Sequence, residues 1–188
     1  MLSKLLEKAV HDQLLTFLES NKLSNDSQFG YRERRSTQLA TTLFVDEIWQ
    51  AAENGKIVGG LFVDLSKAFN TINQDVILNK LSNYGVAFAE TQWFTDYLAI
   101  RNQRVQIGSQ YSSSFSLTCR VPQGSILGPL LFLVFFNDFQ EHLTESDCIQ
   151  YADDTVIYVP LENVNIMKTS STVSQKTFLL AAEIMNWS

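Results

Sequence analysis

The chain is 188 residues long, with 45 % hydrophobic and 18 % charged residues, a composition that excludes a disordered polar segment and is ordinary for a globular domain. Its 20 acidic residues outnumber the 14 basic ones, so the net charge of −6 argues against a protein held to nucleic acid by charge alone. The two cysteines lie far apart, which favours a reducing compartment, and the pattern predicts neither a signal peptide nor a membrane span.

Two helices are predicted in the N-terminal part of the chain. Apolar residues recur with helical spacing over residues 2–20. A second helix is predicted over residues 36–54, with Ser36 or Thr37 as its N-cap and Asn54 at its end.

A strand is predicted to follow over residues 57–65. It shows little polar alternation, which predicts burial on both of its faces in the middle of a sheet. Asp64 interrupts this apolar run. Because charged side chains are rarely buried unless they are paired or bound to a metal, Asp64 is a candidate metal ligand.

The central part of the chain is predicted to alternate helices with a hairpin. Asn73 is a candidate N-cap for a helix that ends near residue 84, and a further helix covers roughly residues 88–100. Residues 104–107 and 115–118 are predicted to pair as a hairpin, and a Pro/Gly-containing loop leads to a helix over about residues 129–142.

Residues 151–154 (Tyr151, Ala152, Asp153 and Asp154) are predicted to form the tip of a second hairpin, because both flanks are rich in β-branched and aromatic residues. An Asp-Asp pair is most often only a solvated turn. Asp64 in an equally apolar setting favours a different interpretation, in which three carboxylates hold Mg²⁺ for two-metal phosphoryl transfer.

The predicted elements interleave helices with antiparallel hairpins, and a last helix is predicted over residues 172–187. This order predicts an α+β domain in which helices cover one side of an antiparallel sheet.

Four stretches form a stronger pattern when they are taken together and in order. They are residues 28–32 followed by 35–37, residues 62–69, residues 121–130 and residues 151–154. In order and spacing they resemble the reverse transcriptases of non-LTR (LINE-like) retrotransposons, over roughly residues 20–160.

The resemblance implies a right-hand polymerase palm, an antiparallel sheet backed by helices, with part of the fingers and no thumb. Residues 1–56 would supply the partial fingers, residues 57–160 the palm, and residues 161–188 a truncated C-terminal helix of the palm. The sequence therefore looks like a fragment of a longer element.

The resemblance also implies RNA-templated DNA synthesis with Mg²⁺ as cofactor, for which Mn²⁺ can substitute. Asp64 and Asp153 would be the main metal ligands and Asp154 the supporting acid. The implied partners are an RNA template, a DNA primer, a deoxynucleoside triphosphate and the rest of the retrotransposon polyprotein, with no membrane. The implied location is intracellular, in nucleus and cytoplasm.

The incoming nucleotide would meet six residues by resemblance. They are Leu65 and Phe69, near the first acid, Gln123 and Gly124, in the Pro/Gly loop, and Arg32 and Arg35, as triphosphate ligands. Five of them have a plainer alternative: Phe69 packs in the core, the loop with Gln123 and Gly124 is an ordinary turn, and the two arginines are solvated.

The sequence shows two departures from the family pattern and leaves two alternative hypotheses. Asn70 stands where many relatives have a second Asp, and Arg120 replaces a small Gly. The rival is a catalytically inactive relic or binding module that keeps the palm fold. An intron-encoded or telomerase-like reverse transcriptase would share the acids but fits residues 125–129 less well.

Overall fold

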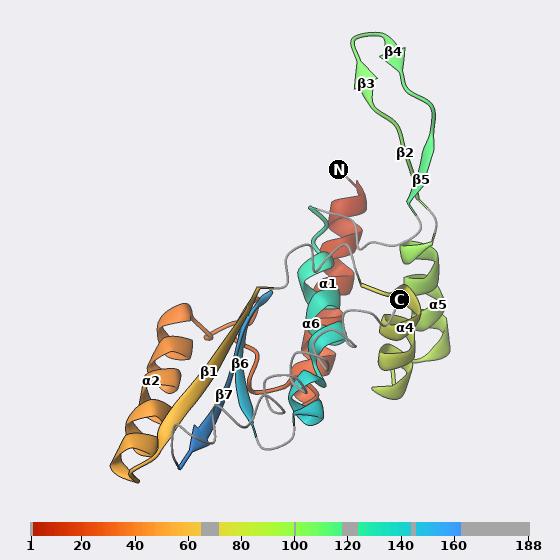
Figure 1. Ribbon diagram of the computed structural model, residues 1–188. Coiled ribbons are helices and arrows are strands. Elements are labelled where there is room, and N and C mark those ends of the chain that lie inside the picture. The colour runs from red at the N-terminus through yellow and green to blue at the C-terminus, as the bar shows by residue number, and fades with distance from the viewer. Residues whose placement is uncertain (1, 65–71, 100, 118–123, 144–145, 163–188) are drawn as a thin grey trace.

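The structure, a computed structural model, describes residues 2–64, 72–99, 101–117, 124–143 and 146–162 (Figure 1). The helix predicted over residues 172–187 lies outside this part of the chain. The helices are α1 (Leu2–Ser20), α2 (Thr37–Glu53), α4 (Gln74–Asn83), α5 (Phe88–Leu98), α6 (Gly128–Phe136) and the 3-10 turn η1 (Phe139–His142). The strands are β1 (Ile57–Asp64), β2 (Arg101–Gln103), β3 (Gln106–Ile107), β4 (Gln110–Tyr111), β5 (Phe115–Leu117), β6 (Asp147–Tyr151) and β7 (Asp154–Leu161).

The helix starts follow the predicted caps. Ser36 is the N-cap of α2, and its hydroxyl accepts a hydrogen bond from the Leu39 amide at 3.2 Å. Asn73 caps α4 in the same way, accepting from the Asp75 amide at 2.9 Å. Each cap satisfies an amide that has no partner inside its helix, so these predictions are confirmed.

The sheet that carries the acidic residues is antiparallel, with strand order β1-β7-β6. β1 pairs along its whole length with β7, from Ile57 opposite Leu161 to Asp64 opposite Asp154. β6 pairs with the other edge of β7. An α+β domain with an antiparallel sheet is therefore confirmed.

The prediction that β1 is buried on both faces is wrong. Leu61 and Val63 are partly buried against the core, whereas Phe62 between them is 73 % exposed. In the described residues β1 is an edge strand with one face toward the core, so alternate residues point away from it. Phe62 occupies the outward position, which explains why an apolar run was mistaken for a fully buried strand.

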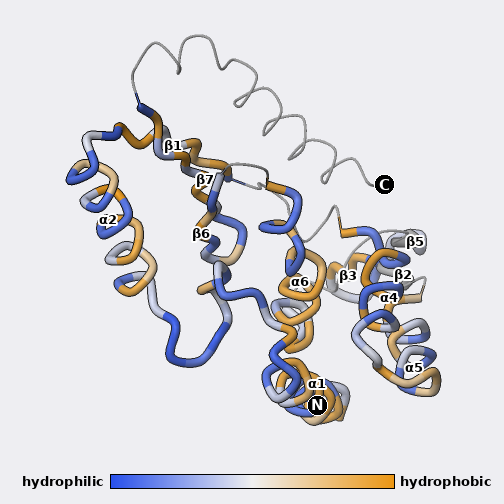
Figure 2. The backbone as a smooth tube through the Cα atoms, turned by 90° about the horizontal axis from the view of Figure 1, so that it is seen from below, coloured by the Kyte–Doolittle hydropathy of each residue, from blue (hydrophilic) through white to orange (hydrophobic). Residues whose placement is uncertain are grey.

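Helices lie on both sides of the sheet rather than on one. α2 runs along one side, where the Phe44 ring meets the rings of Phe62 and Tyr158 at centroid distances of 6.3 and 5.5 Å. α6 lies on the other side, between the sheet and the pair α4 and α5 (Figures 1 and 2). The order of layers is therefore α2, sheet, α6, and then α4 with α5.

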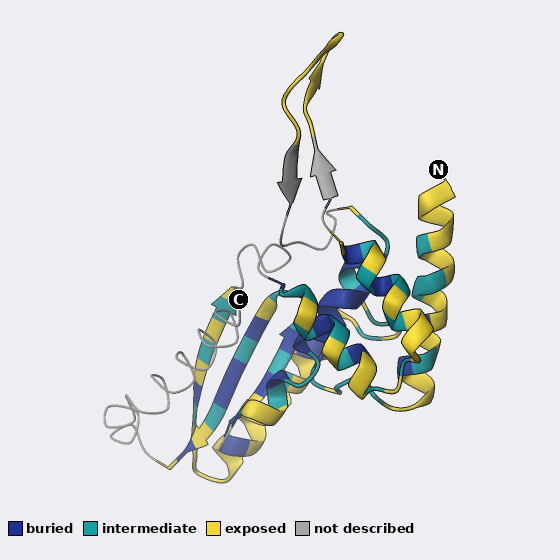
Figure 3. Cartoon of the chain, turned by 90° about the vertical axis from the view of Figure 1, so that its right-hand side faces the viewer, coloured by how far each residue is buried: buried dark blue, intermediate teal, exposed yellow. Residues whose placement is uncertain are grey.

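The helix α6 forms the centre of the core. Eight of its nine residues are buried, in agreement with a sequence that is apolar on every side (Figure 3). α1, α4 and α5 pack their apolar residues into the same cluster, and the sheet adds Cys148 and Ile157. No helix in the described ranges is both long enough and apolar enough to cross a membrane.

The hairpin predicted from residues 104–107 and 115–118 pairs differently. Arg101–Gln103 pairs with Phe115–Leu117, and Gln106–Ile107 pairs with Gln110–Tyr111 around a tight turn at Gly108 and Ser109. Gly108 has φ +61°, the left-handed conformation that glycine adopts without penalty. This turn begins earlier than predicted. The two strand pairs together project away from the body of the molecule (Figure 1).

Candidate active site

The β6–β7 hairpin closes through a two-residue turn made of Ala152 and Asp153. Tyr151 pairs directly with Asp154, so the tetrad forms the tip of the hairpin, as predicted. Ala152 has φ +57°. Tight hairpin turns require such a backbone conformation, although it is unfavourable for a residue with a Cβ atom.

The strand register brings the third acid to the same end of the sheet. Asp64, the last residue of β1, lies opposite Asp154, the first residue of β7. Asp153 is the preceding residue, in the turn. Like charges directly opposite each other on neighbouring strands repel, so this arrangement destabilises the sheet unless a cation neutralises it.

The three carboxylates lie at one end of the sheet without forming a ready-made metal cluster. Within the described ranges, no group of three or more His, Cys, Asp or Glu side chains is placed to hold a metal ion. The donor chemistry suits a hard divalent cation, because oxygen ligands are what Mg²⁺ prefers. The backbone therefore brings the three acids to the same end of the sheet. Their side chains would still have to turn toward one another to bind one ion.

A segment far away in sequence supports the acidic turn. The backbone amide of Phe29 donates to the backbone carbonyl of Gln150 at 2.7 Å, and the backbone amide of Gln150 donates to the backbone carbonyl of Ser27 at 2.8 Å. Residues 27–29 thus continue the sheet beside β6. The Gln28 side chain, 4 % exposed, accepts hydrogen bonds from the amides of Gly30 and Ala152 at 2.8 and 3.2 Å.

Tyr31 lies next to the acids. It has φ +58° and is 47 % exposed. Partial burial raises the pKa of its phenol, and the negative charge of Asp153 raises it further. The phenol therefore stays protonated at neutral pH, as a group that can donate a hydrogen bond beside Asp153.

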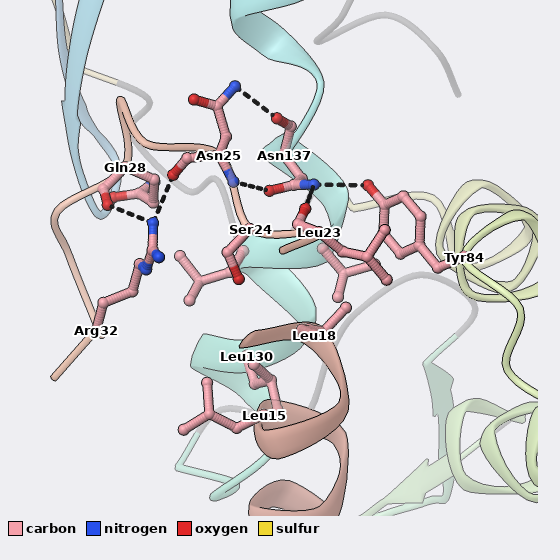
Figure 4. Close-up of a pocket in the computed structure, with 12 residues that line it drawn as sticks. Leu15, Leu18, Leu23, Ser24, Asn25, Gln28, Arg32, Tyr84, Leu130 and Asn137 are labelled. Atoms are coloured by element: carbon pink, nitrogen blue, oxygen red, sulfur yellow. Dashed lines mark hydrogen bonds between the residues drawn. The ribbon is translucent and has the colours of Figure 1, made fainter. Parts of the chain in front are cut away.

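Arg32, predicted as a triphosphate ligand, is engaged within the protein. Its side chain is 9 % exposed, and its guanidinium donates to both carboxylate oxygens of Glu19 and to the Asn25 carbonyl. Figure 4 shows it beside a small pocket, with bonds to the backbone of Asn25 and Gln28. This arrangement ties the 25–32 loop to α1 and leaves Arg32 little capacity to bind phosphate.

The same loop is anchored to the core through Asn137. The Asn137 side chain accepts from the Asn25 amide at 2.8 Å and donates to the Leu23 carbonyl and to the Tyr84 hydroxyl at 2.6 and 2.9 Å (Figure 4). It lies directly after α6. The loop that touches the acidic turn is therefore fastened to the centre of the molecule.

Arg35 is more accessible than Arg32. Its side chain is 24 % exposed, lies over the Phe29 ring at 4.9 Å, and pairs with the carboxylate of Asp26, whose own side chain is 90 % exposed. An exposed partner is easily exchanged for another anion, because surface ion pairs contribute little free energy.

The comparisons with known proteins agree with these motifs. The family model described as reverse transcriptase (RNA-dependent DNA polymerase) matches residues 1–180. This chain belongs to the reverse transcriptase family. A probable RNA-directed DNA polymerase from transposon BS of Drosophila melanogaster is 31 % identical over 143 residues, which is 73 % of this chain and 15 % of that protein.

Other reverse transcriptases from mobile elements are similarly related. The RNA-directed DNA polymerase from mobile element jockey of Drosophila melanogaster is 29 % identical over 172 residues, covering 87 % of this chain and 18 % of the relative. The resemblance to non-LTR retrotransposon enzymes is thereby confirmed. The chain spans less than a fifth of the length of these curated relatives.

A solved telomerase from Candida albicans, in complex with a TWJ fragment of telomeric RNA, shows a weaker likeness. It has 12 % sequence identity and a TM-score of 0.43, over 89 % of this chain and 30 % of that one. Such a likeness is too low to bear on fold or function.

The remaining motif residues of the reverse transcriptase pattern are only partly described. Gly124 is exposed and has φ +76°, with open space where a Cβ atom would stand. Leu65, Phe69 and Gln123 lie outside the described residues, so their predicted contacts with a nucleotide stay predictions. The same holds for the departures at residues 70 and 120.

Proposed function

We propose that this chain is the catalytic core region of a mobile-element polymerase that copies RNA into DNA. The reaction would be attack of a primer 3′-hydroxyl on the α-phosphate of a deoxynucleoside triphosphate, which forms a phosphodiester bond, breaks the bond between the α- and β-phosphates and releases pyrophosphate. The observation that supports it is the register of the sheet, which places Asp64 opposite Asp154 with Asp153 in the adjoining turn.

Asp64, Asp153 and Asp154 would hold the divalent ions that reverse transcriptases use. Mg²⁺ or Mn²⁺ bound there would lower the pKa of the primer hydroxyl and neutralise charge that develops on the phosphates. Binding would also relieve the repulsion between facing carboxylates. The two strands and the turn would hold the acids in place.

The nucleotide site would lie next to these acids. Arg35, Gly124 and the undescribed Leu65, Phe69 and Gln123 are its proposed residues. Arg32 is omitted from this site, because its guanidinium already binds Glu19 and Asn25.

The domain division is part of the same proposal. Residues 1–56 would act as partial fingers, residues 57–160 as palm, and residues 161–188 as the C-terminal helix of the palm. An RNA template and a DNA primer would be the partners, within a larger mobile-element polyprotein. The site of action would be intracellular, in a ribonucleoprotein of nucleus and cytoplasm.

Metal titration tests the proposal directly. Mn²⁺ binding to the chain is measured by calorimetry with a template–primer and a deoxynucleoside triphosphate present. Asp64→Asn is compared with Asp147→Asn, which removes an exposed acid at the opposite end of the same sheet. We expect Asp64→Asn to weaken binding at least about tenfold, since it removes one of three charged oxygen ligands, and Asp147→Asn to leave it unchanged.

Equal affinities in the two variants would refute the assignment of the acids. A folded wild-type chain that binds no Mn²⁺ would favour the rival hypothesis, a catalytically inactive relic or binding module that keeps the palm fold.

A further inference from the structure

Gln28 links two parts of the chain that are 124 residues apart. Its side-chain oxygen Oε1 accepts hydrogen bonds from two backbone amides, those of Gly30 at 2.8 Å and Ala152 at 3.2 Å. The residue is 4 % exposed, so water cannot readily replace it as the acceptor. One buried oxygen thus joins the N-terminal loop to the turn that carries Asp153.

The Ala152 amide has a particular need for this acceptor. Ala152 is the first residue of the two-residue turn, and its φ of +57° is unfavourable for a residue with a Cβ atom. Without this acceptor the partly buried amide would lose its hydrogen bond, which adds a further penalty. Gln28 therefore stabilises the left-handed backbone conformation of Ala152, next to Asp153 in the turn.

Gly30 allows the loop to approach the turn this closely. A Cβ atom on Gly30 would stand 2.1 Å from the Ala152 nitrogen and 2.8 Å from its Cα, and neither backbone atom can move aside without altering the turn. The absence of a side chain is therefore a steric requirement at this position. The parallel bridge of Gln28 with Gln150 fixes the same stretch of loop along the edge of β6.

The loop itself has firm anchors, so it can hold the turn in place. Arg32 ties it to Glu19 on α1, and Asn25 ties it to Asn137 at the end of α6. The acidic turn is thereby connected to the buried core through Gln28 and Gly30, in addition to its own strands.

We propose that Gln28 is a positioning residue, which sets the backbone of the Ala152–Asp153 turn so that the carboxylates can converge on a metal ion. It touches neither metal nor substrate and acts through the Ala152 amide. The metal part of this inference rests on the proposed function. Supporting residues around metal ligands typically change metal affinity by about 10–100-fold when they are replaced.

The chain offers a matched control in Gln140. Its Oε1 accepts a hydrogen bond from the Cys148 amide at 3.0 Å, near the start of β6, whereas Gln28 binds the amide just beyond its end. Both are glutamines whose side-chain oxygen receives a backbone amide of the same hairpin. Methionine has nearly the same shape and lacks the acceptor, so Gln28→Met and Gln140→Met each remove the acceptor of a backbone amide, at opposite ends of the hairpin. Gln140→Met also removes bonds with the Ser27 hydroxyl, the Cys148 thiol and the Asp147 carboxylate, so it is the more disruptive change of the two.

Two measurements are made on each variant: hydrogen exchange of the Ala152 amide by NMR, and Mn²⁺ affinity by calorimetry. We expect Gln28→Met to speed exchange at Ala152 and to weaken Mn²⁺ binding about tenfold or more. Gln140→Met should lower the unfolding midpoint without either effect. Equal exchange rates at Ala152 in the two variants would overturn the proposal, and so would equal Mn²⁺ affinities when wild type binds the ion.

A second variant covers the case in which Gln28→Met does not fold. Gln28→Glu keeps an oxygen at the Oε1 position and should retain slow exchange at Ala152, whereas fast exchange would overturn the proposal. If the wild-type chain binds no Mn²⁺, the proposed function fails on its own. The exchange rates then still decide whether Gln28 positions the turn.

Discussion

The molecule has a helical half, made of α1, α4, α5 and α6, and a sheet half, made of β1, β6, β7 and α2. The two halves differ in the kind of side chain that is buried inside them. The largest fully buried side chains are apolar and belong to α4, α6 and the residues just before them, with one exception. The exception is Gln150 on β6, a polar residue in the sheet half. Apolar side chains therefore fill the interior of the helical half, whereas the sheet half buries polar side chains near its acidic end.

This difference separates the residues that stabilise the fold from those of the proposed site. Burial of apolar side chains supplies most of the free energy of folding, so the helical half should carry most of the stability. The sheet half tolerates facing carboxylates because its acidic end is exposed and needs little packing. A site that accumulates like charges is best placed where few core contacts depend on it.

The strongest expected effect comes from the helical half. Phe132→Ala on α6 should lower the free energy of unfolding by about 3–5 kcal/mol, because Phe132 is fully buried and its removal leaves a cavity. Urea denaturation measures the change. Phe62→Ala on β1 is the control, and we expect a loss of about 1.5 kcal/mol or less there, since Phe62 is 73 % exposed and its ring pairs with that of Phe44. Similar losses of unfolding free energy in both variants would contradict the view that the helical half carries most of the stability.

A smaller effect of opposite sign is expected at the acidic end. Asp154→Asn should raise the free energy of unfolding in metal-free buffer by about 0.2–1 kcal/mol, because it removes the repulsion with Asp64 across the strand pair. Asp147→Asn, whose cross-strand neighbour is Tyr158, is the control without such a gain. A loss of stability in Asp154→Asn would show that this carboxylate has a stabilising partner.

The mildest test leaves the sequence unchanged and uses the thiol of Cys148. The thiol is 3 % exposed, and burial raises its pKa to about 12, so almost no thiolate forms at pH 8 while β6 stays folded. Alkylation with iodoacetamide, mapped by mass spectrometry, should therefore modify Cys148 only when the sheet half opens. Modification faster than global unfolding would show that the sheet half opens by itself and is the less stable of the two halves.

Several features could be predicted from local sequence alone. The N-caps Ser36 and Asn73 and the hairpin turn at Ala152 and Asp153 depend on contacts within a few residues, and all three were predicted. The elements that surround α6 could not be predicted, because a helix that is apolar on every side does not reveal which neighbours pack against it. The pairing of β3 with β4 was also missed. Both the turn at Gly108 and the Ser-rich loop after it could have closed the hairpin, and the sequence does not decide between them.

Sequence alone indicates the family, most of the helices and strands, and the three candidate acids, because motifs and periodicity depend on residues close along the chain. The tertiary structure decided the strand register that places Asp64 opposite Asp154, the capture of Arg32 by Glu19, and the contact of Gln28 with Ala152. Each of these joins residues at least 13 positions apart. Such contacts depend on how whole elements pack, and local propensity does not encode them.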